Sequence, residues 1–291
     1  MTSRQNLRGI VFMLLSMVAF ALADTCVKLA SAFMTPPQVM FYLMLGGLVM
    51  FTLLTFTERE PFFNRNAFAP VVMVRYLAEL VGMVGMIMAL SKVPLSIVGA
   101  ITQAAPILVA VGAALFLGEV VSWRRWTSIC IGFLGVLIIV QPGAEGFDLS
   151  VLWAVLAMLG LALRDLTTRI IPKDIGSASL ATYTMLVSVP FSIGWTWLQG
   201  DTLFPPNINW AIILPMTTLG AIGYVLLIKS IRMAEVSVVT PFRYSRIIFL
   251  ILLGVVVFGE RPGISVLSGA ALVIASGIYI VWRERKAADT R

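Results

Sequence analysis

Long apolar stretches recur along the 291-residue chain, and short polar segments separate them. A membrane-spanning helix needs about 20 consecutive apolar residues to cross the hydrocarbon core of a bilayer. The chain contains ten stretches of about this length, at residues 8–32, 37–57, 68–91, 95–117, 125–141, 150–171, 178–199, 209–230, 236–258 and 264–282. The pattern predicts an all-α integral membrane protein with ten transmembrane helices.

The composition supports this fold class. Hydrophobic residues make up 59% of the chain, charged residues make up 12%, and the mean hydropathy is +0.98. A soluble chain is about 45–50% apolar and about 25% charged, so a soluble domain is excluded. The first apolar stretch ends in Ala21-Leu22-Ala23, which resembles a signal-peptide cleavage site. Because the stretch continues to about Ala32, we expect a first transmembrane helix rather than a cleaved leader.

Several chemistries lack the residues they require. The chain has no histidine, which removes Ser-His-Asp catalysis and His-ligated metals, and Cys26 and Cys130 are far apart within apolar stretches. No Gly-rich phosphate loop of the Walker type occurs, so ATP is not expected as the direct energy source. The basic residues are scattered, which argues against nucleic-acid binding despite the pI near 9.8. We therefore predict no catalytic residue, no metal site, no cofactor and no enzymatic activity.

Lysine and arginine indicate the orientation, because cytoplasmic loops carry an excess of both. With a cytoplasmic N-terminus, 14 basic residues fall in the inner loops and tails and 3 at the outer ends of the spans. This asymmetry predicts that both termini are cytoplasmic.

The chain also matches itself when it is shifted by 141 residues. The matched polar residues include the pairs Asp24 with Asp165, Tyr42 with Tyr183, Ser96 with Ser237, and Gly118-Glu119 with Gly259-Glu260. The match predicts two repeats, at residues 1–143 and 144–291, with five spans each. Because five is odd, the second repeat must enter the membrane in the opposite sense. Such inverted repeats are typical of alternating-access transporters.

A series of short motifs follows the pattern of a known family. They are Ala89-Leu90, Pro94, Pro106, Leu117-Gly118-Glu119, Trp123-Arg124-Arg125-Trp126, Gly132-Phe133-Leu134-Gly135-Val136, Pro142-Gly143 and Phe258-Gly259-Glu260-Arg261. In these motifs the chain resembles the EamA-type permeases of the drug/metabolite transporter superfamily. This resemblance implies a permease of the bacterial inner membrane with two inverted five-helix units. The resemblance also implies a central cavity lined by spans 1, 3, 4, 6, 8 and 9, and small organic metabolites as substrates. One departure is that Arg246-Ile247 stands where the first repeat has Ala105-Pro106.

Apart from residues near the span ends, seven charged residues lie inside the predicted spans, where each is costly unless it faces the bundle interior or a water-filled cavity. They are Asp24, Arg75, Glu79, Arg164, Asp165, Arg243 and Arg246. Arg75 and Glu79 are four residues apart, so they could form an ion pair at an inner gate, or Glu79 could be a protonatable coupling group. Arg164 and the repeat-related Asp24 and Asp165 are further candidates for gate contacts, with substrate contact as the alternative.

Arg243 and Arg246 are the main candidates for substrate binding. They lie near the middle of the ninth span, and a guanidinium there could donate two hydrogen bonds to a carboxylate or phosphate. Structural pairing of these arginines with Glu79 or Asp165 is the alternative. Further candidates line the expected cavity, namely Thr102 and Gln103 in the fourth span, Tyr224 in the eighth, and Thr240 and Tyr244 in the ninth.

The sequence thus predicts a secondary transporter that moves small polar metabolites by alternating access. Amino-acid-like or other carboxylate-bearing compounds and export are favoured. Uptake of a cofactor- or nucleoside-type compound, such as S-adenosylmethionine or riboflavin, is the alternative, and a membrane-embedded enzyme is a remote one. The expected partners are a small-molecule substrate and the lipid bilayer. Coupling to protons or to a counter-substrate stays open, as does the oligomeric state.

Overall fold

The computed structural model describes residues 3–58, 60–61, 64–118, 123–142, 148–172, 174–206 and 208–288, and these residues form helices and no strand. The elements are α1 (Ser3–Ala30), α2 (Pro36–Thr57), η1 (Arg65–Phe68), α3 (Pro70–Lys92), α4 (Leu95–Thr102), α5 (Ala105–Phe116), α6 (Trp123–Val140), α7 (Val151–Thr168), α8 (Ser177–Leu198), α9 (Trp210–Met233), α10 (Val236–Val239), η2 (Thr240–Tyr244), α11 (Ser245–Phe258) and α12 (Ile264–Ala288).

Each of the ten predicted stretches is mainly helical in the residues that the structure describes. Among the described residues, eight helical segments are long and apolar enough to cross a membrane, and the fifth stretch contributes a shorter apolar helix, Trp126–Val140. The seventh stretch forms α8, a 22-residue helix whose serine and threonine residues lower its hydropathy. The all-helical, multi-span fold is confirmed.

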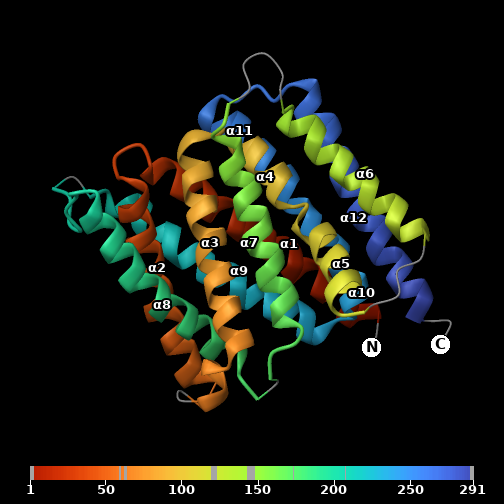
Figure 1. Cartoon of the computed structure of the whole chain (residues 1–291), viewed down its shortest axis with the longest axis horizontal. Helices are drawn as coiled ribbons and strands as arrows, with labels where there is room; N and C mark the ends of the chain where they lie inside the picture. The colour runs from red at the N-terminus through yellow and green to blue at the C-terminus, as the bar shows by residue number, and fades with distance from the viewer. Residues whose placement is uncertain are drawn as a thin grey trace.

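The helices pack in pairs that join residues far apart in the sequence. α1 lies along α9, α3 along α7, α2 along α8, and α6 along α12. Figure 1 shows α6 and α12 side by side at one edge of the molecule. Glycines permit the closest approaches, since a Cβ on Gly160 would collide with Gly82 of α3, and one on Gly135 with the backbone of Gly269.

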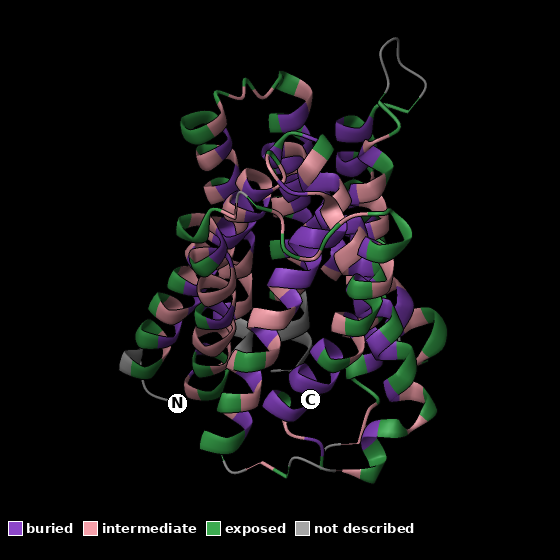
Figure 2. Ribbon diagram, turned by 90° about the vertical axis from the view of Figure 1, so that its left-hand side faces the viewer, coloured by how far each residue is buried: buried purple, intermediate pink, exposed green. Residues whose placement is uncertain are grey.

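Buried residues fill the centre of the bundle, and exposed residues lie on its outside (Figure 2). Many exposed side chains are large and apolar, such as Leu53, Leu252 and Val256. An apolar perimeter of this extent suits lipid contact rather than water. α1 begins and α12 ends at the same end of the molecule (Figure 1).

Two of the predicted spans are interrupted. In the fourth, α4 ends at Thr102 and α5 begins at Ala105, with Pro106 in its first turn. In the ninth, the short 3-10 helix η2 separates α10 from α11 and contains Pro241. Proline lacks an N–H and clashes with the preceding turn, which favours a break in each helix. The two breaks are joined, because Gln103 Nε2 donates a hydrogen bond of 2.8 Å to the Arg243 carbonyl.

Polar side chains at the helix ends tie the two halves of the chain together. The carboxylate of Glu260, after α11, accepts hydrogen bonds from the Leu95 and Ser96 amides at the start of α4. Glu60, after α2, accepts from the amide and hydroxyl of Ser179 in α8. Both carboxylates therefore satisfy free amides at a helix N-terminus.

The two repeat-related tyrosines form related contacts. The Tyr42 hydroxyl donates to the Leu203 carbonyl after α8, and the Tyr183 hydroxyl accepts from the Asn64 amide after α2. Each tyrosine thus holds the loop that follows the other tyrosine's helix.

Candidate functional site

Four charged side chains form a network between α3 and α7, which we call the α3–α7 network (Arg75, Glu79, Arg164 and Asp165). Glu79 forms ion pairs with two arginines. Its Oε2 lies 3.1 Å from Arg75 Nη1, and its Oε1 lies 3.2 Å from Arg164 Nη1. Arg164 Nη2 also lies 2.8 Å from Asp165 Oδ1. The network contains two positive and two negative charges, so its formal charge is zero.

Hydroxyl groups of two neighbouring threonines accept hydrogen bonds from Arg75 of this network. Arg75 Nε donates to Thr168 Oγ1 at 3.1 Å, and its Nη1 donates to Thr184 Oγ1 at 2.8 Å. Arg75 and Glu79 are both buried. Because buried charges are stable only when they are paired and hydrogen-bonded, this arrangement holds α3, α7 and α8 together. The expected Arg75–Glu79 ion pair is present.

A second charged group lies at the interrupted ninth span. Arg246, in the first turn of α11, forms an ion pair with the buried Asp24 of α1. Its guanidinium also lies 5.4 Å from the ring centroid of Phe20, a cation–π distance. The Nε atom of Arg246 is buried and has no hydrogen-bond partner in the described part of the chain. Arg246 therefore pairs with Asp24, and not with Glu79 or Asp165, the partners considered from the sequence.

Arg243, three residues earlier in η2, is held differently. Its carbonyl accepts the hydrogen bond from Gln103, but its half-buried guanidinium has no hydrogen bond or ion pair with any residue that the structure describes. Its charge does act on Asp165 of α7. Arg243 and Arg246, which we call the η2–α11 arginines, thus interact electrostatically with the two repeat-related aspartates.

The charges inside the predicted spans do not cancel. The seven ionisable residues inside the spans comprise four arginines and three carboxylates, which leaves a formal charge of +1. The α3–α7 network is neutral, so the surplus lies with Asp24 and the η2–α11 arginines. An uncompensated positive charge inside a membrane protein is costly without water or an anion. The region is therefore suited electrostatically to a carboxylate or a phosphate.

The other candidate residues have mainly structural contacts. The Thr102 hydroxyl donates to the Val98 carbonyl of its own helix, and Tyr244 is buried against Gly277. The Tyr224 hydroxyl donates to the Ser177 carbonyl at 3.0 Å, and its ring lies edge-on to Phe51. Thr240 is half-buried in η2. None of these contacts tests a role in substrate binding, which stays a prediction.

Two pockets lie away from these residues. One, of about 390 Å³, is between α6 and α12, and the other, of about 280 Å³, is between α2 and α9. Neither is lined by the candidate residues, so the central cavity expected from the resemblance stays a prediction. Glu119 of the repeat match and the repeat boundary at residues 143–144 lie outside the described residues.

Sequence reasoning missed Phe20, which contacts Arg246, and Thr168 and Thr184, which contact Arg75. It also missed the helix-capping role of Glu60 and Glu260, although Glu260 is part of the repeat match. The first three had no signal, since aromatic and hydroxyl residues are common in apolar helices. The two glutamates did have one, because each lies within three residues of the end of an apolar span.

These features define a polytopic helical membrane protein with interrupted helices and buried charges at its centre, a combination that is common in membrane transporters. The sequence pattern of the EamA-like transporter family matches residues 7–141 and again residues 148–282. The chain belongs to this family, and the expectation of an EamA-type permease of the drug/metabolite transporter superfamily is confirmed.

Known proteins resemble the chain over nearly its whole length. An S-adenosylmethionine uptake transporter of Rickettsia bellii is 26% identical and aligns with 96% of this chain and 95% of its own length. A riboflavin transporter of Rhizobium johnstonii is 25% identical over 96% of this chain and 92% of its own. A solved crystal structure, 17% identical, superposes with a TM-score of 0.60 over 99% of each chain, which supports the fold alone. The relatives are transporters of small metabolites, which points to a transporter rather than an enzyme.

Proposed function

We propose that the protein is a secondary transporter of small amino-acid-like or other carboxylate-bearing metabolites, which it exports across the bacterial inner membrane. The observation that carries the proposal is the surplus positive charge at the interrupted ninth span. Arg243 has a guanidinium with no ion-pair partner among the described residues, and Arg246 has a buried Nε without a hydrogen bond. A carboxylate entering this region would accept hydrogen bonds from these guanidinium groups and would neutralise the surplus positive charge.

The contact pattern supports an inverted repeat. An exchange of the two halves by 141 residues converts the α1–α9 contact into the α7–α3 contact, and it converts α2–α8 and α6–α12 into themselves. The two family matches are separated by the same 141 residues. Repeats at 1–143 and 144–291, with cytoplasmic termini, would place the second unit upside down. Two units of this kind can exchange conformations, which opens the path to each side in turn.

The Asp24–Arg246 ion pair offers a way to couple substrate binding to helix movement. It joins α1 to α11, so it crosses the proposed boundary between the repeats. A substrate carboxylate would compete with Asp24 for the Arg246 guanidinium. Binding would then weaken the contact between the two helices, and the released Asp24 could take up a proton or a cationic group of the substrate. The α3–α7 network would serve as the gate on the other side of the site.

Counterflow in proteoliposomes tests this proposal. The purified protein is reconstituted with an unlabelled amino acid inside and the labelled compound outside, over a panel that includes uncharged amides of the same acids. We expect labelled acids to accumulate and the amides to be transported at least about tenfold more slowly. Equal transport of acids and amides, or no transport of any acid, would contradict the proposed substrate class.

The relatives favour a second candidate, uptake of a cofactor- or nucleoside-type metabolite such as S-adenosylmethionine or riboflavin. S-adenosylmethionine carries an amino-acid carboxylate, and riboflavin has none. The same vesicles therefore separate the possibilities, with adenosine and methionine as competitors. Competition by methionine but not adenosine would support recognition of the amino-acid group. Transport of riboflavin alone would instead indicate an aromatic-ring site and would leave the η2–α11 arginines with a structural role. Whole-cell accumulation assays would then give the direction.

A further inference from the structure

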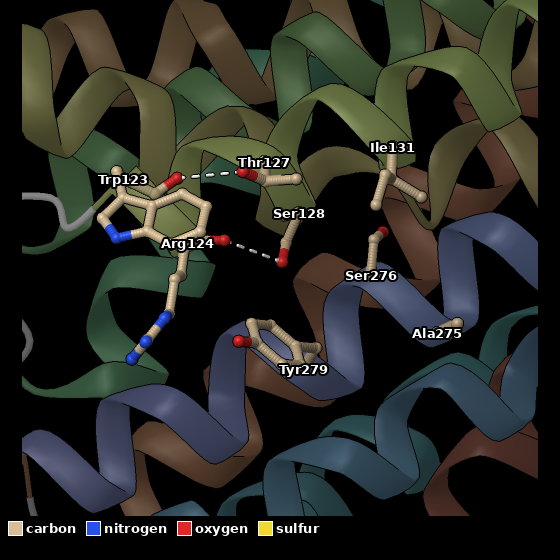
Figure 3. A pocket seen from close by; sticks show the side chains of 8 residues that line it. All are labelled: Trp123, Arg124, Thr127, Ser128, Ile131, Ala275, Ser276 and Tyr279. Atoms are coloured by element: carbon tan, nitrogen blue, oxygen red, sulfur yellow. Dashed lines mark hydrogen bonds between the residues drawn. The ribbon is translucent and has the colours of Figure 1, made fainter.

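An open groove between α6 and α12 has no role in the transport site described above. Its volume is about 390 Å³. Its walls come from both helices, as Figure 3 shows, and are formed by Trp123, Arg124, Thr127, Ser128, Ile131, Ala275, Ser276 and Tyr279. Because α6 and α12 form an outer edge of the bundle, the groove opens toward the region that lipid occupies.

The groove combines apolar walls with two polar groups that lack protein partners. The hydroxyls of Thr127, Ser128 and Ser276 donate to carbonyls of their own helices. Within the described part of the chain, neither the Arg124 guanidinium nor the Tyr279 hydroxyl has a hydrogen-bond partner, although Arg124 lies 5.4 Å from the centroid of the Trp123 ring. Figure 3 shows Arg124 extending from α6 toward α12, on the side where the Tyr279 hydroxyl points.

Aromatic residues place this end of the groove at the level of the lipid headgroups. Trp123 and Trp126 begin α6, and Tyr279 and Trp282 lie near the end of α12, with ring centroids of the latter pair 5.8 Å apart. Tryptophan and tyrosine collect at membrane–water interfaces. The sequence of α12 continues with three basic residues, Arg283, Arg285 and Lys286. This end of the helix pair is therefore positively charged, which favours anionic lipids over zwitterionic ones.

We propose that the groove is a binding site for one anionic phospholipid. The lipid phosphate accepts hydrogen bonds from the Arg124 guanidinium and the Tyr279 hydroxyl, and one acyl chain lies along the groove beside Ile131 and Ala275. The bound lipid fills the space between the last helices of the two halves and so stabilises their contact. The site is separate from the buried arginines and does not depend on the transported substrate.

Native mass spectrometry of the full-length protein in detergent tests the proposal. Phosphatidylglycerol and phosphatidylcholine are titrated separately into wild type, Arg124→Ala, Tyr279→Phe and Ala275→Phe. Arg65→Ala is the matched control, because it removes one exposed positive charge from η1, away from the groove. Thermal unfolding without lipid checks the fold of each variant, and the conservative Tyr279→Phe keeps the test informative if another variant fails to fold.

We expect wild type to bind phosphatidylglycerol more tightly than phosphatidylcholine. Arg124→Ala should weaken phosphatidylglycerol binding about tenfold, as expected when a charge-assisted hydrogen bond is lost, and Tyr279→Phe should weaken it a few-fold. Ala275→Phe should weaken the binding of both lipids, because the larger side chain fills the groove. Arg65→Ala should leave the affinity for both lipids unchanged. Equal phosphatidylglycerol affinities for wild type, Arg124→Ala and Tyr279→Phe would overturn the proposal. A wild-type dimer that Ala275→Phe converts to a monomer without loss of lipid would also overturn it, because a second copy would then occupy the groove.

Discussion

The α3–α7 network and the η2–α11 arginines are two solutions to the same physical problem, a charge inside a membrane protein. In the network, Glu79 forms ion pairs with Arg75 and Arg164, and Arg164 also forms one with Asp165. The formal charge of the network is zero. At the ninth span, Asp24 balances only one of two arginines. The comparison indicates that the number of opposite charges beside a charged side chain distinguishes a structural role from a ligand-binding one. Each charge of the network lies beside an opposite charge, whereas Arg243 has no ion-pair partner among the described residues and the buried Arg246 Nε atom has no hydrogen bond.

The largest effect should come from breaking the α3–α7 network. Glu79→Gln leaves Arg75 and Arg164 buried without a shared counter-charge, so we expect the unfolding free energy to fall by about 3–5 kcal/mol. Thermal unfolding in detergent measures the loss. Glu58→Gln is the control, because it breaks only the exposed, 3.8 Å pair with Arg232 and should change stability little. Similar small changes for both variants would show that the network does not hold the fold.

Arg243→Ala should have the opposite profile, with a large effect on transport and a small one on stability. The substitution removes a guanidinium that stabilises no described ion pair, so thermal unfolding should stay near that of wild type. Transport of carboxylate substrates should fall at least about tenfold, because a bidentate hydrogen bond is lost. Arg243→Lys keeps the charge without the paired donors and should be intermediate. Unchanged counterflow in Arg243→Ala would remove this residue from the binding site.

The Asp24–Arg246 pair should combine both profiles. Asp24→Ala leaves Arg246 buried without its counter-charge and should lower the unfolding free energy by about 3 kcal/mol. The double variant with Arg246→Ala should recover part of that stability, since no unpaired charge is left. It should still fail to transport, because the anion-binding donor is absent. Additive losses of stability in a double-mutant cycle would contradict the coupling between these two side chains.

Gln103→Ala should give a smaller change. It removes the 2.8 Å hydrogen bond from the Gln103 amide to the Arg243 carbonyl, which joins the two helix breaks. We expect a loss of about 1 kcal/mol in unfolding free energy and a few-fold higher KM, because η2 is less well positioned. Gln103→Glu is the matched comparison, since it preserves the shape but places an acceptor against that carbonyl. A KM equal to that of wild type in both variants would show that the link does not position Arg243.

The smallest effect should come from an exposed carboxylate, which contrasts with both buried groups. Hydrogen bonds from Asn64 and Asn66 hold the pKa of the Asp174 carboxyl below its ordinary value of 3.8. A lowered pKa means that the stabilisation is present above pH 3.8 and is lost as the pH falls through the folded-state value. Asp174→Asn should therefore lower the Tm slightly at neutral pH and match wild type in strong acid. A difference that grows toward acid pH would reverse this assignment.

Much of the fold was accessible from the sequence, because hydrophobic length and proline placement are local properties. The ten stretches match helical segments, and the breaks fall beside Pro106 and Pro241. The first helix begins at Ser3 rather than near residue 8, since polar residues can extend a helix past the apolar core. The repeat boundaries and the orientation of the termini stay predictions.

The site was less accessible, because partner choice depends on three-dimensional packing. The i, i+4 spacing predicted the Arg75–Glu79 pair, and this contact is present. No spacing rule could show that Arg246 reaches Asp24, 222 residues away, or that Arg164 joins Glu79. Once the pairs are known, the free donors of Arg243 and Arg246 follow by elimination.

The central claim is that the surplus charge of the η2–α11 arginines recognises a carboxylate. The most direct test compares counterflow of the best transported acid with that of its carboxamide, in wild type and in Arg243→Ala vesicles of equal protein content. The account predicts at least about a tenfold preference for the acid in wild type and little preference in the variant. A preference for the acid that persists unchanged in folded Arg243→Ala protein would contradict the account.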